Sequence, residues 1–336
     1  MFHYFINMIH FALVQLSKKH TEIFGTFIEI ILYYNWELTI YYDKDNDPYT
    51  FLNYYNKLFN INLNILSTSE LIVNKNNHDY FIFTSSADNS HIDSYFTQSS
   101  MASRCIYVNH QAQHCQPHMI KNIQMSPVIK LKDLENKIIT CIVPFYRSYK
   151  KIHSTSLKTN LAIIGAIRPH QKDKDLSLLI NLLDKCKNGG YNIYIFMRKM
   201  DWKVISNKNK FLKNNSNIKF FPGLSTEKMI EKLKEVKFIL PLSQQDGWFY
   251  WQRLTGTIPL AINLNIPLVM DIKLAKIYNL ENCCILYENN INEIIDKIMS
   301  ITHDDYYKLI ENVVLFKREQ ASLNKKRFLD ICLEQI

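Results

Sequence analysis

Glycine is scarce in this chain: only 7 of the 336 residues are glycine, and six of these lie at or beyond residue 165. Neither G-x-G-x-x-G nor G-x-x-x-x-G-K-[ST] occurs, so the signatures of simple dinucleotide-binding and P-loop proteins are absent. In so glycine-poor a chain we expect each glycine where the backbone needs a positive φ or where another group approaches closely.

Long apolar runs are also lacking, so no membrane-spanning segment is expected. Residues 1–16 are apolar but interrupted by polar residues, and they lack the basic region and small-residue cleavage site of a signal peptide. The 7 cysteines form no C-x-x-C motif. Their odd number and apolar surroundings predict buried free thiols in a reducing compartment, so we expect a cytoplasmic location.

Basic residues outnumber acidic ones, 40 to 31, for a formal net charge of +9. Such a balance suits an anionic partner such as a nucleoside diphosphate, a nucleic acid or a membrane surface. The alternative is solvated lysines on ordinary helices, which their spread along the chain favours. Since no helix–turn–helix or RNA-recognition motif is visible, we expect no nucleic-acid partner and at most a peripheral contact with membranes.

Apolar strands alternate with amphipathic helices along the chain. A strand at 9–16, a helix at 18–34 and a strand at 36–42 form a βαβ opening, which predicts a parallel sheet. Further strands are expected at 61–66, 80–84, 105–109, 138–143, 160–165, 191–197, 218–221, 238–242, 267–270 and 283–287. Helices are expected at 175–187 and 225–235, and the tail 304–336 is expected to be one broken helix or two.

A basic, polar stretch without apolar periodicity, residues 145–159, divides the two runs of strands and indicates a linker. We therefore predict an α/β protein with an N-terminal Rossmann-like domain at 1–150. A second Rossmann-like domain follows at 151–310, and a C-terminal helix at 311–336.

Two segments after the linker share the order and spacing of motifs in a known family. In NLAIIGAIRPHQKDKDLSLLINLL a strand ends in Gly165, and Arg168 and then Lys174 follow near the start of a helix. Two cations beside a helix N-terminus are suited to binding an anion. In IKFFPGLSTEKMIEKLKEVKFILPLS a strand is followed by Gly223, a helix, and a second strand that ends in Pro and Ser.

These segments resemble the donor domain of GT-B glycosyltransferases, in particular the retaining family 4-like enzymes (glycosyl transferases group 1). The resemblance implies a GT-B fold, with two Rossmann-like domains facing each other across a cleft and a last helix that crosses back to the first domain. It implies that Arg168 and Lys174 hold the donor diphosphate, with Lys172 as a competing second cation. It also places Gly165, Gly223 and Leu224 near the donor, with the latter two by the nucleobase.

Ser243 would face the donor from the end of its strand, and Arg198, which follows another strand, is a further candidate for the phosphates or a solvated residue. A third segment, QRLTGTIPLAINLNIPLVMD, departs from the family pattern. Its two acidic positions fall on Gln252 and Leu260, so both carboxylates are absent; the second usually binds the donor ribose, and Asp246 is a shifted substitute for the first. Arg253 and a helix N-terminus at Thr255–Gly256 remain available to hold phosphate.

In the first domain, the resemblance assigns His110, which follows a strand, to the donor sugar. A neutral imidazole suits a sugar hydroxyl or a phosphate proton. Two alternatives stay open: a zinc site with His114, Cys115 and His118, and a histidine without a special role. Residues 20–22 either face the cleft or cap a helix.

The aromatic run Trp248–Trp251 is suited either to stacking on a sugar or base or to interdomain packing. The resemblance thus implies a hexosyltransferase-like enzyme that uses a UDP-, GDP- or dTDP-sugar without a metal and with retention. The acceptor would be a glycan, a protein or a lipid. A non-catalytic GT-B-like nucleotide- or carbohydrate-binding protein is the alternative, because the carboxylates are missing, and a nucleic-acid binder is a third class.

Overall fold

The structure is a computed structural model of the whole chain. It describes residues 8–16, 21–43, 50–84, 95–96, 101–110, 119–125, 127, 138–145, 160–165, 174, 179–180, 182–183, 186, 190–199, 215–243, 255–288 and 291–334. The chain forms two compact units: unit 1 comprises residues 1–147 and 321–336, and unit 2 comprises residues 148–320.

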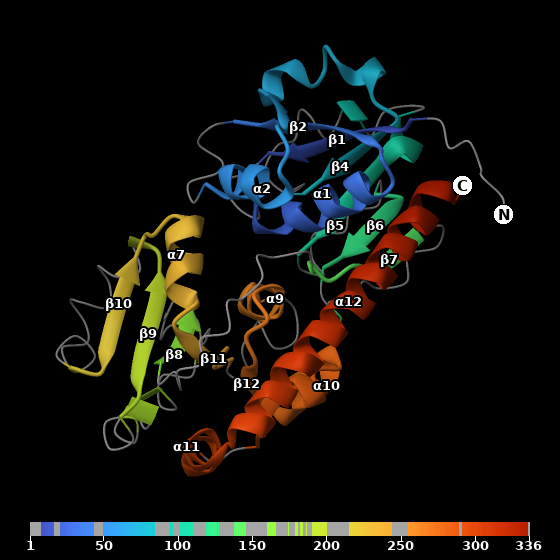
Figure 1. Cartoon of the computed structure of the whole chain (residues 1–336). Helices are drawn as coiled ribbons and strands as arrows, with labels where there is room; N and C mark the ends of the chain where they lie inside the picture. The colour runs from blue at the N-terminus through green and yellow to red at the C-terminus, as the bar shows by residue number, and fades with distance from the viewer. Residues whose placement is uncertain are drawn as a thin grey trace. The chain divides into compact units, whose positions relative to one another are not determined.

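Unit 1 is built on a seven-stranded sheet in the order β3-β2-β1-β4-β5-β6-β7, and Figure 1 labels all of its strands except β3. Every pair of neighbours is parallel. The strands are β1 (His10–Gln15), β2 (Glu37–Tyr42), β3 (Asn64–Leu66), β4 (Tyr80–Phe83), β5 (Cys105–Asn109), β6 (Lys121–Gln124) and β7 (Ile138–Cys141). The predicted βαβ opening is confirmed.

Unit 2 has a six-stranded, all-parallel sheet in the order β10-β9-β8-β11-β12-β13. The strands are β8 (Asn160–Ile164), β9 (Asn192–Met197), β10 (Ile218–Pro222), β11 (Val236–Ile239), β12 (Leu268–Asp271) and β13 (Cys284–Tyr287). The strand expected at 238–242 therefore lies slightly earlier, because the chain turns at Pro241 and at Leu242, whose φ is 48°.

The helices are α1 (Phe24–Tyr33), α2 (Phe51–Phe59), α7 (Thr226–Leu233), α9 (Thr257–Asn263), α10 (Ile272–Tyr278), α11 (Ile291–Ser300) and α12 (His303–Leu333). Short 3₁₀ turns are η1 (Thr21–Ile23), η3 (Thr68–Glu70), η4 (Lys75–Asn77), η5 (Ala102–Arg104) and η8 (Glu281–Cys283). The expectation of a broken tail helix is wrong. α12 is one helix of 31 residues, and a polar residue within it is satisfied without a break: Asn324 is buried and donates to the carbonyl of Val143 at 2.7 Å.

Asparagine takes the place of glycine where helices end in a left-handed residue. The φ angles of four such residues lie between 52° and 55°, and each of the four follows a helix: Asn35, Asn60, Asn265 and Asn279. Asparagine tolerates this conformation better than other side chains, so it can end a helix where glycine usually does. The chain is thus able to form its turns with few glycines.

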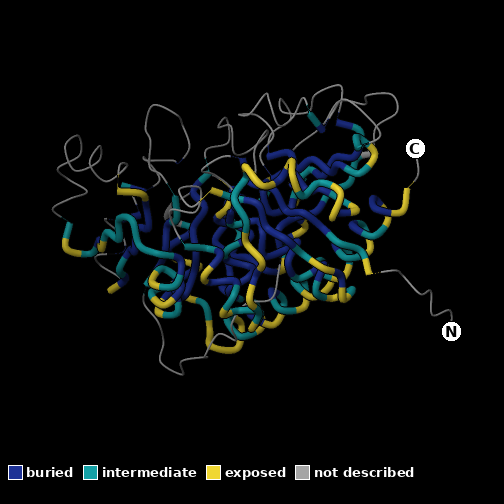
Figure 2. Tube along the Cα trace, turned by 90° about the horizontal axis from the view of Figure 1, so that it is seen from above, coloured by how far each residue is buried: buried dark blue, intermediate teal, exposed yellow. Residues whose placement is uncertain are grey.

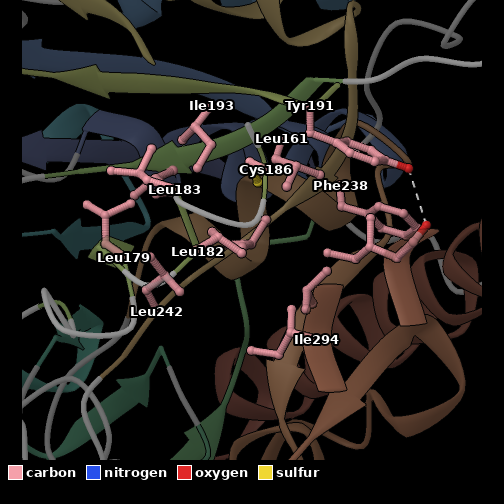
Figure 3. Close-up of a cluster of buried hydrophobic side chains, with 14 of the residues drawn as sticks. Leu161, Leu179, Leu182, Leu183, Cys186, Tyr191, Ile193, Phe238, Leu242 and Ile294 are labelled. Carbon is pink, nitrogen blue, oxygen red and sulfur yellow. Dashed lines mark hydrogen bonds between the residues drawn. The ribbon is translucent and has the colours of Figure 1, made fainter. Parts of the chain in front are cut away.

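Each sheet carries an apolar core, and buried positions lie inside while exposed ones lie at the periphery (Figure 2). In unit 2, Leu179, Leu182 and Leu183 at helical positions pack with strand residues Leu161 and Ile193 (Figure 3). Such a buried leucine contributes roughly 2 kcal/mol by leaving water. This core holds Leu179, Leu182, Leu183 and Cys186 against the strands of the sheet.

α12 contributes residues to both units. In unit 1, Phe328 is fully buried against Phe11 and Phe27, with ring centroids 5.6 and 5.9 Å away. In unit 2, Asn312 donates to the carbonyl of Asn282 at 2.8 Å. The helix is therefore packed into the core of one unit and hydrogen-bonded within the other.

Candidate functional site

Each sheet has a topological switch point, where the strand order reverses. It lies between β1 and β4 in unit 1 and between β8 and β11 in unit 2. Since the strands of each sheet are parallel, their carboxyl ends meet at one edge, and open α/β sheets bind ligands there. Residues that follow these four strands are the first candidates for a site.

Gly165 follows β8 at the switch point of unit 2. Its φ is +102°, and its N–H donates to the carbonyl of Phe196 in β9 at 2.9 Å. A Cβ at this position would meet no atom within 4 Å. Backbone conformation, not space, therefore requires glycine here.

Lys174 is brought to the same switch point from the segment after β8. Only 8% of its surface is exposed, and its ammonium donates to the carbonyl of Pro241, which follows β11. The next residue, Leu242, is buried with a φ of 48°, a left-handed conformation that is rare for a bulky side chain. Strained backbone of this kind concentrates at functional sites.

The start of α9 is tied to the end of β8. The hydroxyl of Thr257 donates to the carbonyl of Ile164 at 3.0 Å, and Thr255 just before it is buried. Gly256 is exposed with a φ of −60° and no atom within 4 Å of an added Cβ. The expectation that each glycine is needed for geometry is thus wrong at Gly256. Leu260, on α9, is half-buried.

A second glycine, Gly223, packs against the side chain of Lys199 at the same edge of the sheet. Gly223, after β10, has a φ of +66°, and its N–H donates to the carbonyl of Met197 at 2.7 Å. A Cβ here would lie 2.5 Å from Cγ of Lys199, so any other residue would force the lysine side chain to move. Lys199 and its neighbour Arg198 follow β9 and are exposed.

Of the residues expected to bind the donor, the structure gathers Gly165, Lys174, Ser243 and Thr255–Gly256 at the ends of β8 and β11 and the start of α9. Ser243 is half-buried after β11, and Leu224 is half-buried between β10 and α7. Other expected residues lie outside the described part of the chain: Arg168, Lys172, Arg253, Gln252, Asp246 and Trp248–Trp251.

In unit 1, His110 follows β5 and is 7% exposed. Its Nε2 lies 2.9 Å from the carbonyl oxygen of Thr84, the residue after β4. A carbonyl oxygen only accepts, so Nε2 carries the hydrogen, and in the neutral ring Nδ1 holds the lone pair. This bond selects one tautomer of the imidazole.

Thr84 is itself anchored to β1 at the switch point. Its N–H and its hydroxyl both donate to the carbonyl of Val14 at 3.0 Å, and the hydroxyl contacts the amide of Gln15, the last residue of β1. Gln15 and Thr84 are fully buried. Sequence reasoning found His110 but missed Gln15 and Thr84, although both are polar residues at the end of an apolar strand.

The other expectations for unit 1 have mixed outcomes. His20, His114, Cys115 and His118 lie outside the described residues. In the part of the chain that the structure describes, no three His, Cys, Asp or Glu residues are close enough to hold a metal ion. Thr21 is buried, and the hydroxyl of Tyr55 donates to its carbonyl and to that of Glu22, at 3.2 and 2.7 Å.

Within the described residues, every helix is too short or too polar to cross a membrane.

Comparison with protein-family models and with curated proteins gave no match. Solved structures, in contrast, resemble the chain over nearly its whole length. An α-glucosyltransferase in complex with UDP and a 13-mer DNA containing an HMU base has a TM-score of 0.67 at 12% identity, covering 96% of this chain and 99% of that one.

A glycosyltransferase from Rickettsia africae has a TM-score of 0.58 at 14% identity, over 96% of this chain and 99% of the other. A T4 phage BGT mutant in complex with UDP-glucose has a TM-score of 0.57 at 12% identity, over 97% and 100%. Together with the two parallel sheets and their strand orders, these likenesses show that the chain has a GT-B fold.

Proposed function

We propose that this protein transfers a sugar from a nucleoside diphosphate sugar, with UDP as the favoured nucleotide, to an acceptor hydroxyl. The bond between the anomeric carbon and the diphosphate oxygen breaks, and the diphosphate leaves with the electron pair. The acceptor oxygen forms the new glycosidic bond and releases its proton. As the resemblance of the sequence implies, we propose family 4-like chemistry with retention and without a metal ion.

The observation that carries this proposal is the buried ammonium of Lys174 at the switch point of unit 2. A diphosphate gains negative charge as it leaves, and a cation held in place beforehand stabilises that charge without reorganising. Because Gly165 has no side chain, a diphosphate could approach the backbone at the end of β8. Arg168, Lys172, Arg198 and Arg253 are proposed as further phosphate ligands, with Gly223, Leu224, Ser243 and Thr255–Gly256 lining the donor.

In unit 1, His110 is proposed to face a hydroxyl group of the donor sugar or of the acceptor. Nε2 uses its hydrogen in the bond to the carbonyl of Thr84. In the neutral ring Nδ1 is therefore the atom that can accept a hydrogen bond. A hydroxyl donor fits that atom chemically, and because Nδ1 is buried, the proposal requires the groups that cover it to move when the sugar or acceptor binds.

The alternative is a GT-B-like protein that binds a nucleotide-sugar without turning it over, because Gln252 and Leu260 replace two carboxylates. Thermal shift with UDP-, GDP- and dTDP-sugars identifies the donor, since a specific ligand raises the Tm by mass action. Release of the nucleotide with formation of a glycosylated product then separates transfer from binding alone. EDTA should leave the rate unchanged, and the anomeric configuration of the product tests retention.

Lys174→Met tests the donor site. The matched control is Lys228→Met, at an exposed lysine of α7. We expect Lys174→Met to lower kcat/KM by about 100-fold or more, the effect of removing one preorganised charge-stabilising group, and the control to leave it unchanged. Lys174→Arg keeps a cation and should recover part of the rate. Equal activity of Lys174→Met and wild type would refute the proposed role.

For the acceptor we propose DNA, in place of the glycan, protein or lipid that the sequence suggested and in place of its prediction of no nucleic-acid partner. Two solved structures that resemble the chain favour it: the α-glucosyltransferase in complex with UDP and DNA containing an HMU base, and an α-glucosyltransferase in complex with UDP-glucose and DNA containing an abasic site. Each is matched over 99% of its length, at 12% identity. Incubation with UDP-glucose and duplex DNA with or without the HMU base tests it: mass spectrometry should find one added hexose only on the HMU duplex. Transfer to a glycan or lipid with none to DNA would exclude this acceptor.

A further inference from the structure

Leu242 holds a backbone conformation that its side chain disfavours. Six non-glycine residues in the described part of the chain have a positive φ. Four of them are the asparagines that end helices, and a fifth, Thr50, precedes α2. Leu242, with a φ of 48°, comes after strand β11 and is the one member of this group with an apolar side chain. The usual role of a left-handed residue at the end of a helix therefore does not account for it.

The core of unit 2 accounts for the persistence of this conformation. Leu242 is 1% exposed and belongs to the apolar cluster that also contains Leu179 and Leu182 (Figure 3). Glycine or asparagine would turn the chain here with less strain, but neither could fill the core. Burial of the leucine side chain offsets the cost of its left-handed backbone. Leu242 thus ties the chain to the core at the point where it turns away from β11.

The residue before Leu242 anchors the buried cation of the proposed donor site. Leu240 still follows the sheet, because its N–H donates to the carbonyl of Ala162 in β8 at 2.8 Å. Pro241 comes next and has no N–H to donate. Its carbonyl accepts from the ammonium of Lys174. The left-handed residue is therefore bonded directly to the group that holds this ammonium in place.

We propose that Leu242 is a positioning residue of the donor site, an inference that rests on the function proposed above. Its buried side chain fixes the turn that directs the Pro241 carbonyl toward Lys174, and the ammonium is thereby held for the donor diphosphate. The same turn sets the direction of Ser243, the half-buried residue that follows. Lys174 contacts the ligand, and Leu242 acts through it. Because a cation that is held beforehand loses little freedom on binding, the affinity for the diphosphate depends on this packing.

The test compares leucine-to-alanine changes at two buried positions of the same cluster. Leu242→Ala removes the side chain that fixes the turn, and Leu183→Ala, at a fully buried helical position, is the matched control. Both changes remove the same atoms from one core, so both should lower the urea concentration at which the protein unfolds. Isothermal titration calorimetry on the folded variants measures the Kd for UDP and for uridine, which lacks the diphosphate.

We expect Leu242→Ala to weaken UDP binding by about tenfold or more, the effect of losing one well-placed charge-assisted hydrogen bond, and to leave the affinity for uridine nearly unchanged. Leu183→Ala should bind both ligands as wild type does. Leu242→Met fills similar space without branching at Cβ and should bind UDP as wild type does. In the Lys174→Met background, Leu242→Ala should have no further effect on UDP, because both changes remove the same interaction.

A purely structural role for Leu242 predicts different results. Equal loss of UDP affinity in Leu242→Ala and Leu183→Ala would overturn the inference, because damage to the core alone would then suffice. Loss of uridine affinity together with UDP affinity, or additive effects of Leu242→Ala and Lys174→Met, would overturn it as well. If Leu242→Ala does not fold, Leu242→Gly takes its place with the same expectations, because glycine removes the side chain and the backbone strain together.

The wild-type titration separates this inference from the proposed function. If wild type binds UDP and Leu242→Ala binds it equally well, the positioning role of Leu242 is refuted and the donor site stands. If wild type binds none of UDP, GDP and dTDP, the donor site itself is refuted.

Discussion

The imidazole of His78 in unit 1 is a buried base whose protonation should destabilise the fold. It is 3% exposed, and its Nε2 lies 2.8 Å from the hydroxyl oxygen of Tyr41. Its Nδ1 is buried without a hydrogen-bond partner among the described residues. Burial first of all, and then the nearby His10 and Arg104, lower the pKa of His78 to about 4 in total, while Asp79 acts in the opposite direction.

The size of the effect follows from that pKa. In the unfolded chain the pKa is near the ordinary 6.5. As the pH falls below 6.5, the unfolded chain takes up a proton that the folded chain does not bind until about pH 4. The free energy of unfolding therefore decreases across this window, by about 3 kcal/mol in total, because each pKa unit is worth about 1.4 kcal/mol. Above pH 6.5 no such loss occurs.

The assay is urea unfolding followed by circular dichroism, from about pH 7 to about pH 4, on wild type and His78→Gln. Glutamine keeps a polar group for Tyr41 but cannot take up the proton. We expect the wild type to lose about 3 kcal/mol more than His78→Gln over this range. His303→Gln, at an exposed histidine, should follow the wild type. Parallel pH profiles of wild type and His78→Gln would refute the reasoning.

Three further changes test the backbone and the switch points. Gly223→Ala should cost about 1–2 kcal/mol from the left-handed conformation alone and should also displace Lys199, as urea unfolding would measure. Asn279→Ala should cost about 1 kcal/mol, whereas Asn279→Gly should be neutral or stabilising, by the same measurement. Thr84→Val should lower the free energy of unfolding by about 1–3 kcal/mol and should lower kcat, because it removes the hydroxyl that bonds to Val14. Thr84→Ser should keep wild-type stability and kcat, because the serine hydroxyl can still bond to Val14 and hold the carbonyl that orients His110.

Apolar strands were the easiest feature to predict from the sequence. In a parallel sheet both faces are covered, so these strands read as continuous apolar runs. β5 shows the effect, since all its residues are buried and its predicted bounds are those of the structure. The continuous helix α12 was harder to predict, because its apolar positions belong to the cores of two different units.

β6 shows where pattern reasoning fails. Its sequence, Lys-Asn-Ile-Gln, has one apolar residue, yet Lys121 and Asn122 are buried. The ammonium of Lys121 donates to the carbonyl of Cys332 near the end of α12 at 3.4 Å, and the amide of Asn122 donates to the carbonyl of Met119 at 2.6 Å. These partners come from distant or non-repetitive chain segments, so no local periodicity reveals the strand.

The candidate site divides in the same way. Gly165, Lys174 and His110 could be predicted, because each is a recognisable residue type that comes after a predicted strand. The anchoring of Lys174 on Pro241 and of His110 on Thr84 depends on carbonyl groups, which every residue possesses and no sequence pattern marks. Sequence can therefore name a cation or an imidazole, but the tautomer and the direction of each group come from the fold.

Unit 2 has 26 basic and 17 acidic residues, a net charge of +9, and this charge affects both ligands proposed for the protein. It would attract the donor diphosphate and the DNA phosphates alike, so salt should weaken both interactions. The diphosphate would contact the buried Lys174, where screening by salt is small, whereas DNA would contact exposed lysines, where it is large. The two ligands should therefore differ strongly in salt dependence even though they bind the same unit: raising the salt should release DNA while the nucleotide stays bound. A nucleotide-sugar and DNA whose affinities fell in parallel with rising salt would indicate one shared, exposed anion site in place of a buried donor site.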